Sequence, residues 1–436
     1  MDKEIKERIA AINSGIIPEG YKKTKVGIVP VEWEIVKLVN IMHNEPRPVD
    51  KPNEPYIRIG IRSHAKGTFQ ELVENPAEVN MDTLYVVKKD DIVVNITFAW
   101  EHAIALASEE DDGKLVSHRF PTYVFDNNSP LYYKYVFCQD MFRQRLELIS
   151  PGGAGRNRVL NKTDFINLEI YHPPLPEQQK IAEILSTQDK LIELQEKKIE
   201  QLKELKKAYL QKMFPKKGSK YPELRFKGFT DPWEQRKLIT IADVLDGDRG
   251  KNYPAESDFT ASGHTLFLNA SNVTKDGFSF VDNQYISEEK SDSMGNGKLQ
   301  EDDIVVTSRG SLGHIAWYND DIMRFIRHAR INSGMLILRK KMALDSSYLY
   351  QFMKSHKGQE QISFISFGSA QPQLTKAGVE KLNIDLPNDL EEQTQIGSFF
   401  SQFDTLITLH QRKSEQEKQK EKALMQLLLT GIVRTK

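Results

Sequence analysis

The sequence predicts an α+β fold that is repeated within the chain, with two globular blocks of mixed helix and strand, each followed by a long helix. Two observations predict it. A tryptophan-containing segment recurs 200 positions apart, and a heptad-patterned segment recurs 215 positions apart. Repeats of this kind divide a chain before any single motif is considered.

Composition limits the function classes. The 436 residues are enough for two to three domains, and 60 Lys and Arg balance 61 Asp and Glu. A net charge of −1 excludes a polycationic DNA-coating protein, so phosphates would be bound through local patches. The single cysteine, Cys138, excludes a disulfide scaffold. Because no apolar run reaches the roughly 18 residues of a membrane span, we expect a cytoplasmic protein without membrane association.

The first repeat marks where each globular block begins. The segment VEWEIVKLVNI surrounds Trp33 and DPWEQRKLITI surrounds Trp233, with Trp, Glu, Lys and Leu in common. A repeated tryptophan is more often a core anchor than a binding residue. We therefore interpret both tryptophans as scaffold.

The second repeat predicts the long helices. PEQQKIAEILSTQDKLIEL begins at Pro176 and EEQTQIGSFFSQFDTLITL begins at Glu391. In the first copy a heptad seam predicts a helix over about 178–214, on the order of 55 Å long, which Pro215 ends. The seam consists of Ile181, Leu185, Gln188, Ile192, Gln195, Ile199, Leu202, Leu205, Tyr209 and Met213.

The second copy carries a similar seam. Its apolar positions are Ile396, Phe400, Phe403 and Ile407, and the segment from His410 is polar. A stripe this narrow predicts a partner helix, so we expect the two copies to pack against each other as a coiled coil. Two separate solvated helices are the alternative.

The N-terminal segment repeats the end of the first long helix. Ile5, Ile9 and Ile12 have helical spacing, and the 200-residue offset places Ile5 on Leu205 and Ile9 on Tyr209. The chain therefore begins with the tail of a helical repeat, as if a two-fold symmetric ring had been opened there.

The globular blocks read as mixed helix and strand. β-Branched and aromatic runs predict strands from Tyr56, Leu84, Ile92 and Thr122 in the first block, and from Ile304, Gly313 and Gly334 in the second. Helices are predicted over 131–149 and 348–362. We expect a helical segment, a first domain, a central helix, a second domain and a C-terminal helix, over residues 1–20, 21–175, 176–217, 218–388 and 389–436.

Motifs for catalysis are missing from the sequence. The Pro-Pro of His172-Pro173-Pro174-Leu175 lacks the amide and the aromatic residue of an adenine methyltransferase loop. The chain has no phosphate-binding G-x-x-x-x-G-K-[ST] and no H-E-x-x-H. We expect a protein that is not an enzyme and that binds no cofactor or metal itself.

Side chains suited to phosphates and base edges are Arg, Lys, Asn, Gln and Ser in loops. Such residues follow predicted strands or glycine-rich turns in both blocks, although a surface charge or a turn cap is an equally good interpretation of any one. The candidate DNA contacts are Arg58, Arg62, Lys66, Arg119, Arg156, Asn157 and Arg158 in the first block, and Ser308, Arg309, Arg327, Arg330, Gln371 and Gln373 in the second. If the blocks read different sequences, the readers lie where the blocks differ, and shared residues such as Gln178 and Gln393 are scaffold.

The order of these blocks resembles the specificity (S) subunit of type I restriction–modification systems over essentially the whole chain. The matching features are the entries at Trp33 and Trp233, Leu-Pro-Glu-Gln-Gln-x-Ile from Leu175, Glu-Glu-Gln-x-x-Ile from Glu391, and the strand followed by glycine over 303–310. The two copies depart from each other in two places. Glu391 stands where the first copy has Pro176, and Asn95-Ile96-Thr97-Phe98 replaces the Ser-Arg-Gly of the second block.

The resemblance implies two target recognition domains separated by two long antiparallel helices, in a subunit that is not catalytic alone. It implies double-stranded DNA as ligand and, as partners, two adenine-N6 methyltransferase (M) subunits and ATP-hydrolysing restriction (R) subunits. S-adenosylmethionine, ATP and Mg²⁺ are then expected in the partner subunits, and the DNA target is expected to be bipartite, with an unspecified gap.

Two domains that enter successive major grooves on one face of a duplex sit about 34 Å apart, which a helical strut can set. Three alternatives stay open from the sequence. The first is a type IIB-like specificity subunit, the second a coiled-coil interaction scaffold without a DNA role, and the third a free-standing enzyme.

Overall fold

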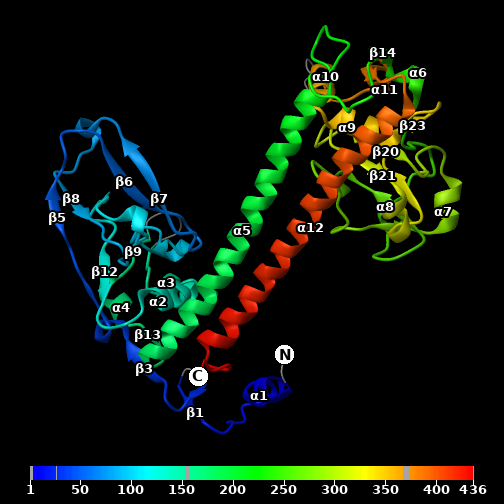
Figure 1. Cartoon of the computed structure of the whole chain (residues 1–436). Coiled ribbons are helices and arrows are strands. Elements are labelled where there is room, and N and C mark those ends of the chain that lie inside the picture. The colour runs from blue at the N-terminus through cyan, green and yellow to red at the C-terminus, as the bar shows by residue number, and fades with distance from the viewer. Residues whose placement is uncertain (1–2, 26, 153–157, 367–372, 436) are drawn as a thin grey trace. The chain divides into compact units, whose positions relative to one another are not determined.

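The computed structural model describes residues 3–25, 27–152, 158–366 and 373–435 (Figure 1). The chain divides into two compact units. Unit 1 comprises residues 1–195 and 413–436, and unit 2 comprises residues 196–412. Two long helices, α5 (Leu175–Met213) and α12 (Leu390–Leu429), each contribute one part to each unit.

Unit 1 holds most of its strands in two sheets. The larger has the order β5-β8-β11-β6-β7 and the smaller the order β10-β9-β12-β4. Their strands are β4 (Met42–Asn44), β5 (Pro48–Asp50), β6 (Tyr56–Ile61), β7 (Thr68–Val73), β8 (Thr83–Val86), β9 (Ile92–Val94), β10 (Ile104–Leu106), β11 (Leu115–Val116) and β12 (Thr122–Phe125). The strands predicted from Tyr56, Leu84, Ile92 and Thr122 are thereby confirmed.

Helices and shorter elements complete unit 1. Two strand pairs, β1–β2 and β3–β13, lie outside the two sheets. These remaining elements are α1 (Lys3–Asn13), β1 (Tyr21–Thr24), β2 (Gly27–Pro30), β3 (Glu34–Lys37), η1 (Leu38–Asn40), η2 (Pro76–Glu78), η3 (Ala99–Glu101), η4 (Glu109–Asp111), α2 (Pro130–Phe137), α3 (Asp140–Leu148), α4 (Lys162–Ile166) and β13 (Glu169–His172). Side chains from both α5 and α12 enter the main core of this unit, as Leu185 and Leu428 illustrate.

Unit 2 has a four-stranded sheet of order β15-β23-β20-β21 and a three-stranded sheet of order β19-β16-β22. Two strand pairs, β14–β24 and β17–β18, accompany them. The strands are β14 (Glu234–Lys237), β15 (Ala242–Asp246), β16 (Thr265–Leu268), β17 (Val273–Thr274), β18 (Gly277–Phe278), β19 (Tyr285–Ile286), β20 (Asp303–Thr307), β21 (Ile315–Tyr318), β22 (Ala329–Ile331), β23 (Met335–Lys340) and β24 (Asn383–Leu386). The three strands predicted for this block are therefore present.

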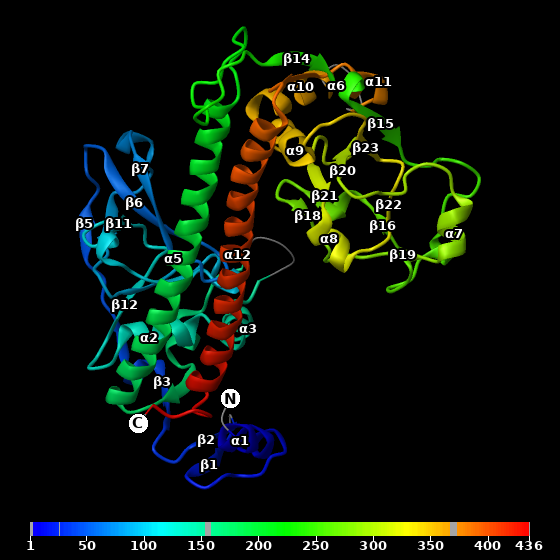
Figure 2. The same cartoon turned by 45° about the vertical axis from the view of Figure 1, so that its right-hand side comes forward.

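The remaining elements of unit 2 are mostly short helices. They are α6 (Leu238–Ile241), η5 (Glu256–Asp258), η6 (Ala270–Asn272), α7 (Glu288–Ser293), α8 (Asp320–Phe325), α9 (Ser346–Lys354), α10 (His356–Ser366) and α11 (Lys376–Glu380). Within each unit, the short helices and the long-helix segments can be followed in two views (Figure 1, Figure 2).

The repeated tryptophans are core anchors, as expected. Trp33 is fully buried, and its indole Nε1 donates to Glu177 at 2.9 Å. Trp233 is equally enclosed, and its Nε1 donates to Glu392 at 3.3 Å. Each glutamate opens a long helix, so each tryptophan fixes the start of a helix to its own unit.

In each unit a guanidinium completes this anchor. Arg225 donates to both carboxylate oxygens of Glu392, at 2.6 and 2.8 Å. Arg434 does the same to Glu177, at 2.7 and 2.9 Å. Fork-shaped pairs of this kind are the geometrically most specific ion pairs. The two units therefore use the same buried device, in which an arginine that follows one long helix pairs with the glutamate at the start of the other.

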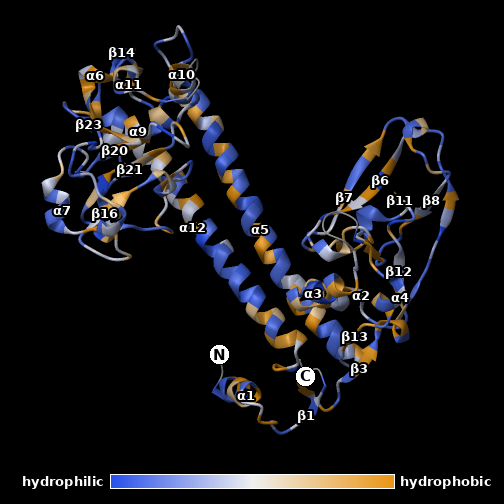
Figure 3. Cartoon of the chain, turned by 180° about the vertical axis from the view of Figure 1, so that it is seen from behind, coloured by the Kyte–Doolittle hydropathy of each residue, from blue (hydrophilic) through white to orange (hydrophobic). Residues whose placement is uncertain are grey.

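The long helices contact each other inside each unit. In unit 1, Gln188 Nε2 donates to the Glu417 carboxylate at 2.7 Å. In unit 2, the Tyr209 ring lies 5.2 Å from that of Phe399, measured between centroids. Both helices also carry long hydrophilic stretches, as expected of helices with only a narrow apolar seam (Figure 3).

One position of the predicted seam is wrong. Leu205 is 47% exposed, whereas its neighbour Lys206 is 7% exposed. The reason is electrostatic, because Lys206 Nζ lies 2.7 and 2.8 Å from the two carboxylate oxygens of Asp404 on α12. An ion pair with good geometry thus displaces the apolar side chain from the seam at this turn.

The helices predicted over 131–149 and 348–362 are each broken into two. In unit 2 the break falls at Ser355, whose extended backbone ends α9 and whose Oγ accepts the Gly358 amide of α10. In unit 1 the break falls at Gln139, which is also extended. The break brings the rings of Phe137 and Phe142 to a centroid distance of 4.6 Å, so aromatic packing favours the bend.

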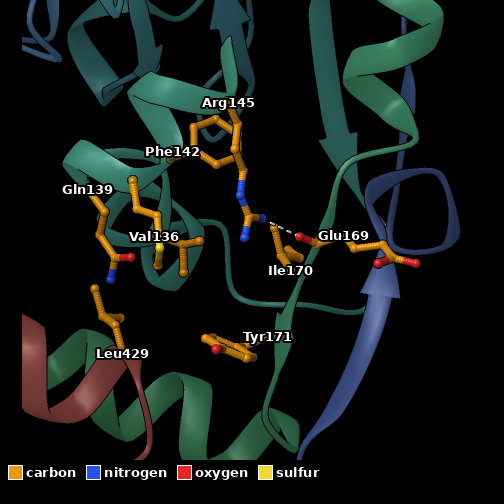
Figure 4. Close-up of a pocket in the computed structure, with 9 residues that line it drawn as sticks. Val136, Gln139, Phe142, Arg145, Glu169, Ile170, Tyr171 and Leu429 are labelled. Atoms are coloured by element: carbon orange, nitrogen blue, oxygen red, sulfur yellow. Dashed lines mark hydrogen bonds between the residues drawn. The ribbon is translucent and has the colours of Figure 1, made fainter. Parts of the chain in front are cut away.

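An arginine ties the second of these helices to the sheet edge in unit 1. Arg145 of α3 donates to the backbone carbonyl of Glu169 on β13 (Figure 4). The cavity beside it has a volume of about 30 Å³ and is closed at one side by Leu429. That volume is far below the roughly 300 Å³ of a small-molecule site, so this cavity belongs to the packing of the fold.

Two aspartates at repeat-equivalent places connect a short helix of each unit to a long helix. Asp189 of α5 accepts hydrogen bonds from Tyr135 Oη at 2.8 Å and from Lys134 Nζ at 3.0 Å. Asp404 of α12 accepts one from Gln351 Nε2 at 2.8 Å. The domain helices α2 and α9 are therefore fixed on their long helices by a buried or half-buried carboxylate.

Candidate nucleic-acid interface

In unit 1 a closed loop joins the central strands β9 and β10. The Asn95 amide donates to the Ala103 carbonyl at 3.0 Å, which closes the loop at its base. The Asn95 side chain then accepts the amide of Thr97 at 3.1 Å and its hydroxyl at 2.8 Å. Because Asn95 is only 8% exposed, it sets the loop shape and is not a ligand-binding group. The short helix η3 forms the far side of the loop.

The turn of the β6–β7 hairpin rests on this loop. The amides of His64 and Ala65 donate to the carbonyls of Glu101 and His102, both at 2.8 Å. Two of the predicted DNA contacts, Arg62 and Lys66, are exposed in the same turn. The guanidinium of Arg62 also lies 5.4 Å from the centre of the Phe69 ring, which supports it from behind.

Two further predicted arginines adjoin the same loop. Arg119 follows β11, its carbonyl accepts the Ile96 amide at 3.0 Å, and its side chain is exposed. Arg158 places its guanidinium 5.3 Å from the centre of the Trp100 ring in η3. Arg158 also forms an ion pair with Glu147 at 3.3 Å. The structure thus brings Arg62, Lys66, Arg119 and Arg158 to one loop.

The other predicted residues of unit 1 do not join this group. Arg58 lies within strand β6, and Glu71 on β7 pairs with it at 2.7 Å across the hairpin. A cross-strand ion pair is a sufficient reason for that arginine. Arg156 and Asn157 lie outside the described residues.

Unit 2 has a loop at the corresponding place, between β20 and β21. The Thr307 amide donates to the His314 carbonyl at 3.0 Å, and the Thr307 hydroxyl accepts the His314 amide at 2.9 Å. Thr307 therefore orders this loop as Asn95 orders the first. Ser308 is 2% exposed and is part of the frame, whereas the side chain of Arg309 faces solvent.

A second chain segment runs beside this loop in both units. The Leu160 amide donates to the Ile96 carbonyl at 2.8 Å, and the Leu374 amide donates to the Ser308 carbonyl at 3.0 Å. The glycine-bearing segments that contain the predicted residues Arg158 and Gln373 therefore end at equivalent points. Gln373 is half-buried directly before Leu374, and Gln371 lies outside the described residues.

Arg330 requires a correction. It is 2% exposed, and its guanidinium donates to the carbonyls of Ser291 at 2.8 Å and Asn296 at 2.9 Å, and to that of Gly295. A guanidinium enclosed by backbone carbonyls holds the fold together and does not face a base. We therefore remove Arg330 from the candidate contacts.

Arg327 does not lie with Arg309. Arg327 precedes β22, which runs parallel to β16. The stacked rings of His264 and His328, with centroids 4.2 Å apart, lie at the N-terminal end of these two strands. The loop of Arg309 lies at the opposite end, where the Asn332 amide donates to the Leu268 carbonyl. The candidate contacts Arg327 and Arg309 therefore do not form one cluster.

Two features of the site were missed from the sequence. In unit 2 the polar segment 269–272 directly follows β16, as the turn of Arg62 directly follows β6 in unit 1. This segment lies beside the loop between β20 and β21, because a Cβ built on Gly310 would lie 3.9 Å from the Cβ of Ala270. In unit 1 the aromatic pair Phe98 and Trp100 lies inside the loop between β9 and β10. The parallel pairing of β16 with β22 and of β6 with β11 places these segments, and parallel pairings leave no local sequence signal.

The buried imidazole of His102, at the inner side of the loop between β9 and β10, donates from Nε2 to the Phe137 carbonyl, and burial lowers its pKa. Within the described residues no group of three His, Cys, Asp or Glu side chains is arranged to hold a metal ion. In the same part of the chain, no helix is long and apolar enough to cross a membrane.

Comparison with known families decides the class of the protein. The model of the type I restriction modification DNA specificity domain matches twice, over residues 30–204 and 230–419. The chain belongs to this family. Each match begins near a repeated tryptophan and continues into a long helix, so the internal repeat corresponds to two DNA specificity domains.

Individual relatives of this specificity subunit agree. It is 24% identical over 438 residues to the MjaX type I restriction enzyme specificity subunit of Methanocaldococcus jannaschii, covering 96% of this chain and 97% of the relative. It is 28% identical over 306 residues to the MjaVIII specificity subunit of the same organism, covering 69% and 70%. As a member of this family, the subunit recognises DNA and is not the catalytic component.

Solved structures share the mixed helix and strand fold. The S subunit of a type I restriction–modification system from M. genitalium matches with a TM-score of 0.58 at 16% identity, covering 93% of this chain and 96% of that one. A chain solved in a study of complex assembly and conformational transition of the type I R-M system matches with a TM-score of 0.51 at 17% identity, covering 93% and 99%. At these identities the likeness concerns the fold alone.

Proposed function

We propose that each unit reads one half of a bipartite double-stranded DNA target and that the two halves are separated by an unspecified gap. The observation that carries this proposal is the repeat-equivalent loop in each unit, closed by Asn95 in unit 1 and by Thr307 in unit 2, with a second segment hydrogen-bonded beside it. The exposed side chains on the two loops differ. Equivalent frames with different exposed groups suit two readers of unlike sequences.

The candidate contacts are Arg62, Lys66, Arg119 and Arg158 in unit 1, and Arg309 and Gln373 in unit 2. Arginine and glutamine pair with guanine and adenine edges, while lysine neutralises phosphates. The other predicted residues stay secondary candidates. Arg58 is paired with Glu71, Ser308 is buried, and Arg327 lies at another strand end. The remaining three, outside the described residues, are Arg156, Asn157 and Gln371.

We further propose that α5 and α12 act as an antiparallel coiled-coil spacer with pseudo-two-fold symmetry. At about 1.5 Å per residue, the 39 residues of α5 extend about 58 Å. A rigid spacer of this kind sets the length of the gap between the half-sites.

The partners expected from this role are two adenine-N6 methyltransferase (M) subunits and restriction (R) subunits in the cytoplasm. S-adenosylmethionine, ATP and Mg²⁺ belong to those subunits. The motif-poor sequence supports this division of labour, because the chain lacks the loops that would bind such groups.

The direct test is to map N6-methyladenine in DNA from cells that express a type I M subunit with and without this chain. We expect methylation at one bipartite sequence only when the chain is present. Binding of the purified complex to the mapped sequence is expected to fall steeply as salt rises, by roughly 0.9 log unit per log unit of salt for each phosphate contact. Salt-indifferent or absent DNA binding favours the interaction scaffold, and a co-purifying fused nuclease–methyltransferase favours the type IIB-like alternative.

A further inference from the structure

Phe98 is partly exposed in the loop between β9 and β10. Its carbonyl accepts the amides of Glu101 at 2.9 Å and Ala103 at 3.2 Å, so the backbone of this residue closes the loop. The side chain itself is 42% exposed. The exposed part of the phenyl ring has no apolar burial to stabilise it, and the loop shape is set by Asn95 and the backbone.

Positively charged side chains adjoin the loop that carries this ring. The guanidinium of Arg158 lies over the ring of Trp100, which follows Phe98 by two residues in η3. Arg119 adjoins the same loop, because its carbonyl accepts the Ile96 amide. The hairpin turn that carries Lys66 is hydrogen-bonded to the last residues of η3. Exposed cations around an apolar tip suit a polyanion, because the cations hold phosphates while the tip reaches the bases between them.

The junction beneath Phe98 is held in one conformation. His64, Ala65 and His102 have φ angles of 62°, 52° and 67°, in the left-handed region that non-glycine residues seldom adopt. Such residues persist only where the surroundings over-determine them. Here the His64 amide donates to the Glu101 carbonyl and the Ala65 amide to the His102 carbonyl, so the turn and η3 fix each other. The ring of Phe98 therefore stands on a rigid base.

The corresponding loop of unit 2 presents no such ring. Gly310 stands there with a φ of 72°, and its neighbour Arg309 carries the exposed side chain. The two loops thus differ in chemistry, with an aromatic ring in unit 1 and a guanidinium in unit 2.

We propose that Phe98 makes an apolar contact with a base in the half-site that unit 1 reads. The proposal rests on the proposed function and adds the residue and the kind of contact. Two base surfaces offer this chemistry, namely the C5-methyl group of thymine and the face of a base at an opened step. A protein partner is the alternative ligand for this ring, but the arginines and the lysine of the adjoining segments favour nucleic acid.

The test uses the full chain in complex with its methyltransferase subunit and the target mapped by methylation. Three variants are compared with the wild type: Phe98→Ala, Phe98→Leu and, as a matched control, Phe325→Ala, whose ring is 83% exposed in unit 2. Affinity is measured for the target and for duplexes with either half-site scrambled. We expect Phe98→Ala to bind the target about tenfold more weakly, Phe98→Leu to recover most of the loss, and Phe325→Ala to bind as the wild type.

Two duplex series identify the base surface. Replacement of single thymines of the first half-site by uracil removes only the methyl group, and we expect about a threefold to fivefold loss at one position if the contact is to that group. A 2-aminopurine probe at each step brightens if the ring opens a step. In either case the signal is expected to vanish in Phe98→Ala.

The proposal is overturned if Phe98→Ala binds like the wild type, if it loses discrimination at the second half-site instead, or if both duplex series are silent. It is also overturned if Phe98→Ala loses only the association with the methyltransferase subunit. Failure of the proposed function looks different, because the wild-type complex would then not distinguish the target from either scrambled duplex. Equal melting temperatures of the variants show that folding is unchanged.

Discussion

Lys206 on α5 and Asp404 on α12 form a bidentate ion pair inside unit 2, with Nζ 2.7 and 2.8 Å from the two oxygens. The 215-residue offset of the repeat places Glu421 at the position of Lys206 and Asp189 at that of Asp404. The first unit therefore has two acids facing each other where the second has a cation and an acid. In unit 1 the cation that pairs with Asp189 is therefore Lys134, which comes from α2 and not from a long helix.

Replacing Lys206 is expected to destabilise unit 2. Lys206→Met leaves the Asp404 carboxylate, whose side chain is 32% exposed, with Gln351 as its remaining partner among the bonds described above. We expect the free energy of unfolding to fall by about 2 kcal/mol, measured by urea denaturation. The neighbouring exposed lysine offers a control, because Lys207→Met should change the value by less than about 0.5 kcal/mol. Equal effects of the two variants would contradict a structural role for the pair.

The ionisation of Glu421 is expected to lower the stability of unit 1 as the pH rises from about 4.5 to about 7. Burial and the neighbouring Asp189 raise the pKa of Glu421 to about 7, while the unfolded chain titrates near 4.5. Between those values the folded state holds a proton that the unfolded state has released, so stability falls with rising pH and levels off above the folded pKa. Lys134 and Lys418 oppose the shift, and Tyr135 also faces the pair.

Denaturation curves between pH 4 and pH 8 test this dependence. Glu421→Gln is expected to flatten it and to stabilise the protein at pH 8, because the amide keeps the shape without the charge. The exposed Glu415 provides the control variant, Glu415→Gln, which should leave the slope unchanged. A slope that survives in Glu421→Gln assigns the titration to another group.

Arg330 is expected to matter for stability and not for sequence recognition. Arg330→Ala leaves the carbonyls of Ser291, Gly295 and Asn296 without their donor inside the fold, and we expect a loss of about 3 kcal/mol. A thermal melt measures the loss. In the fraction that folds, the methylated sequence should be that of the wild type, and a changed target with unchanged stability would restore Arg330 as a reader.

Arg309 is expected to act on one half-site only. Arg309→Ala should weaken binding to the mapped target by about 1–3 kcal/mol and relax the sequence of the second half-site at one position. Competition binding with single-base variants measures both effects. Arg324→Ala, which removes an exposed arginine of α8 that is not a candidate DNA contact, serves as the control. A uniform loss over all sequences would make Arg309 a phosphate contact.

The parts of the fold that the sequence predicted are those with local or repeated signals. The long helices follow from the heptad seam, and the buried Trp33 and Trp233 follow from their repetition. The sequence did not predict that Lys206 is buried, because its partner Asp404 lies 198 positions away and a heptad count places leucine in the seam first. The break at Ser355 was missed for a similar reason, since a single serine cap interrupts an otherwise helical pattern.

The candidate site divides in the same way. Strand ends and glycine-rich turns indicated Arg62, Lys66, Arg119, Arg158 and Arg309, which are exposed or half-exposed in the structure. Arg330 looked like the same kind of residue because the carbonyls that enclose it come from a segment 34 to 39 positions earlier. The sequence did not separate Arg327 from Arg309, because a sequence does not state which end of a parallel strand a loop extends.

A methylation map after the spacer has been lengthened tests whether the two long helices set the gap between the half-sites. Insertion of one helical turn, four residues, near Gln195 of α5 and at the paired turn of α12 adds about 6 Å to both helices. If the helices set the distance between two readers, the complex should methylate the same two half-sites with a gap longer by about one or two base pairs. Altered half-sites with an unchanged gap would contradict the account.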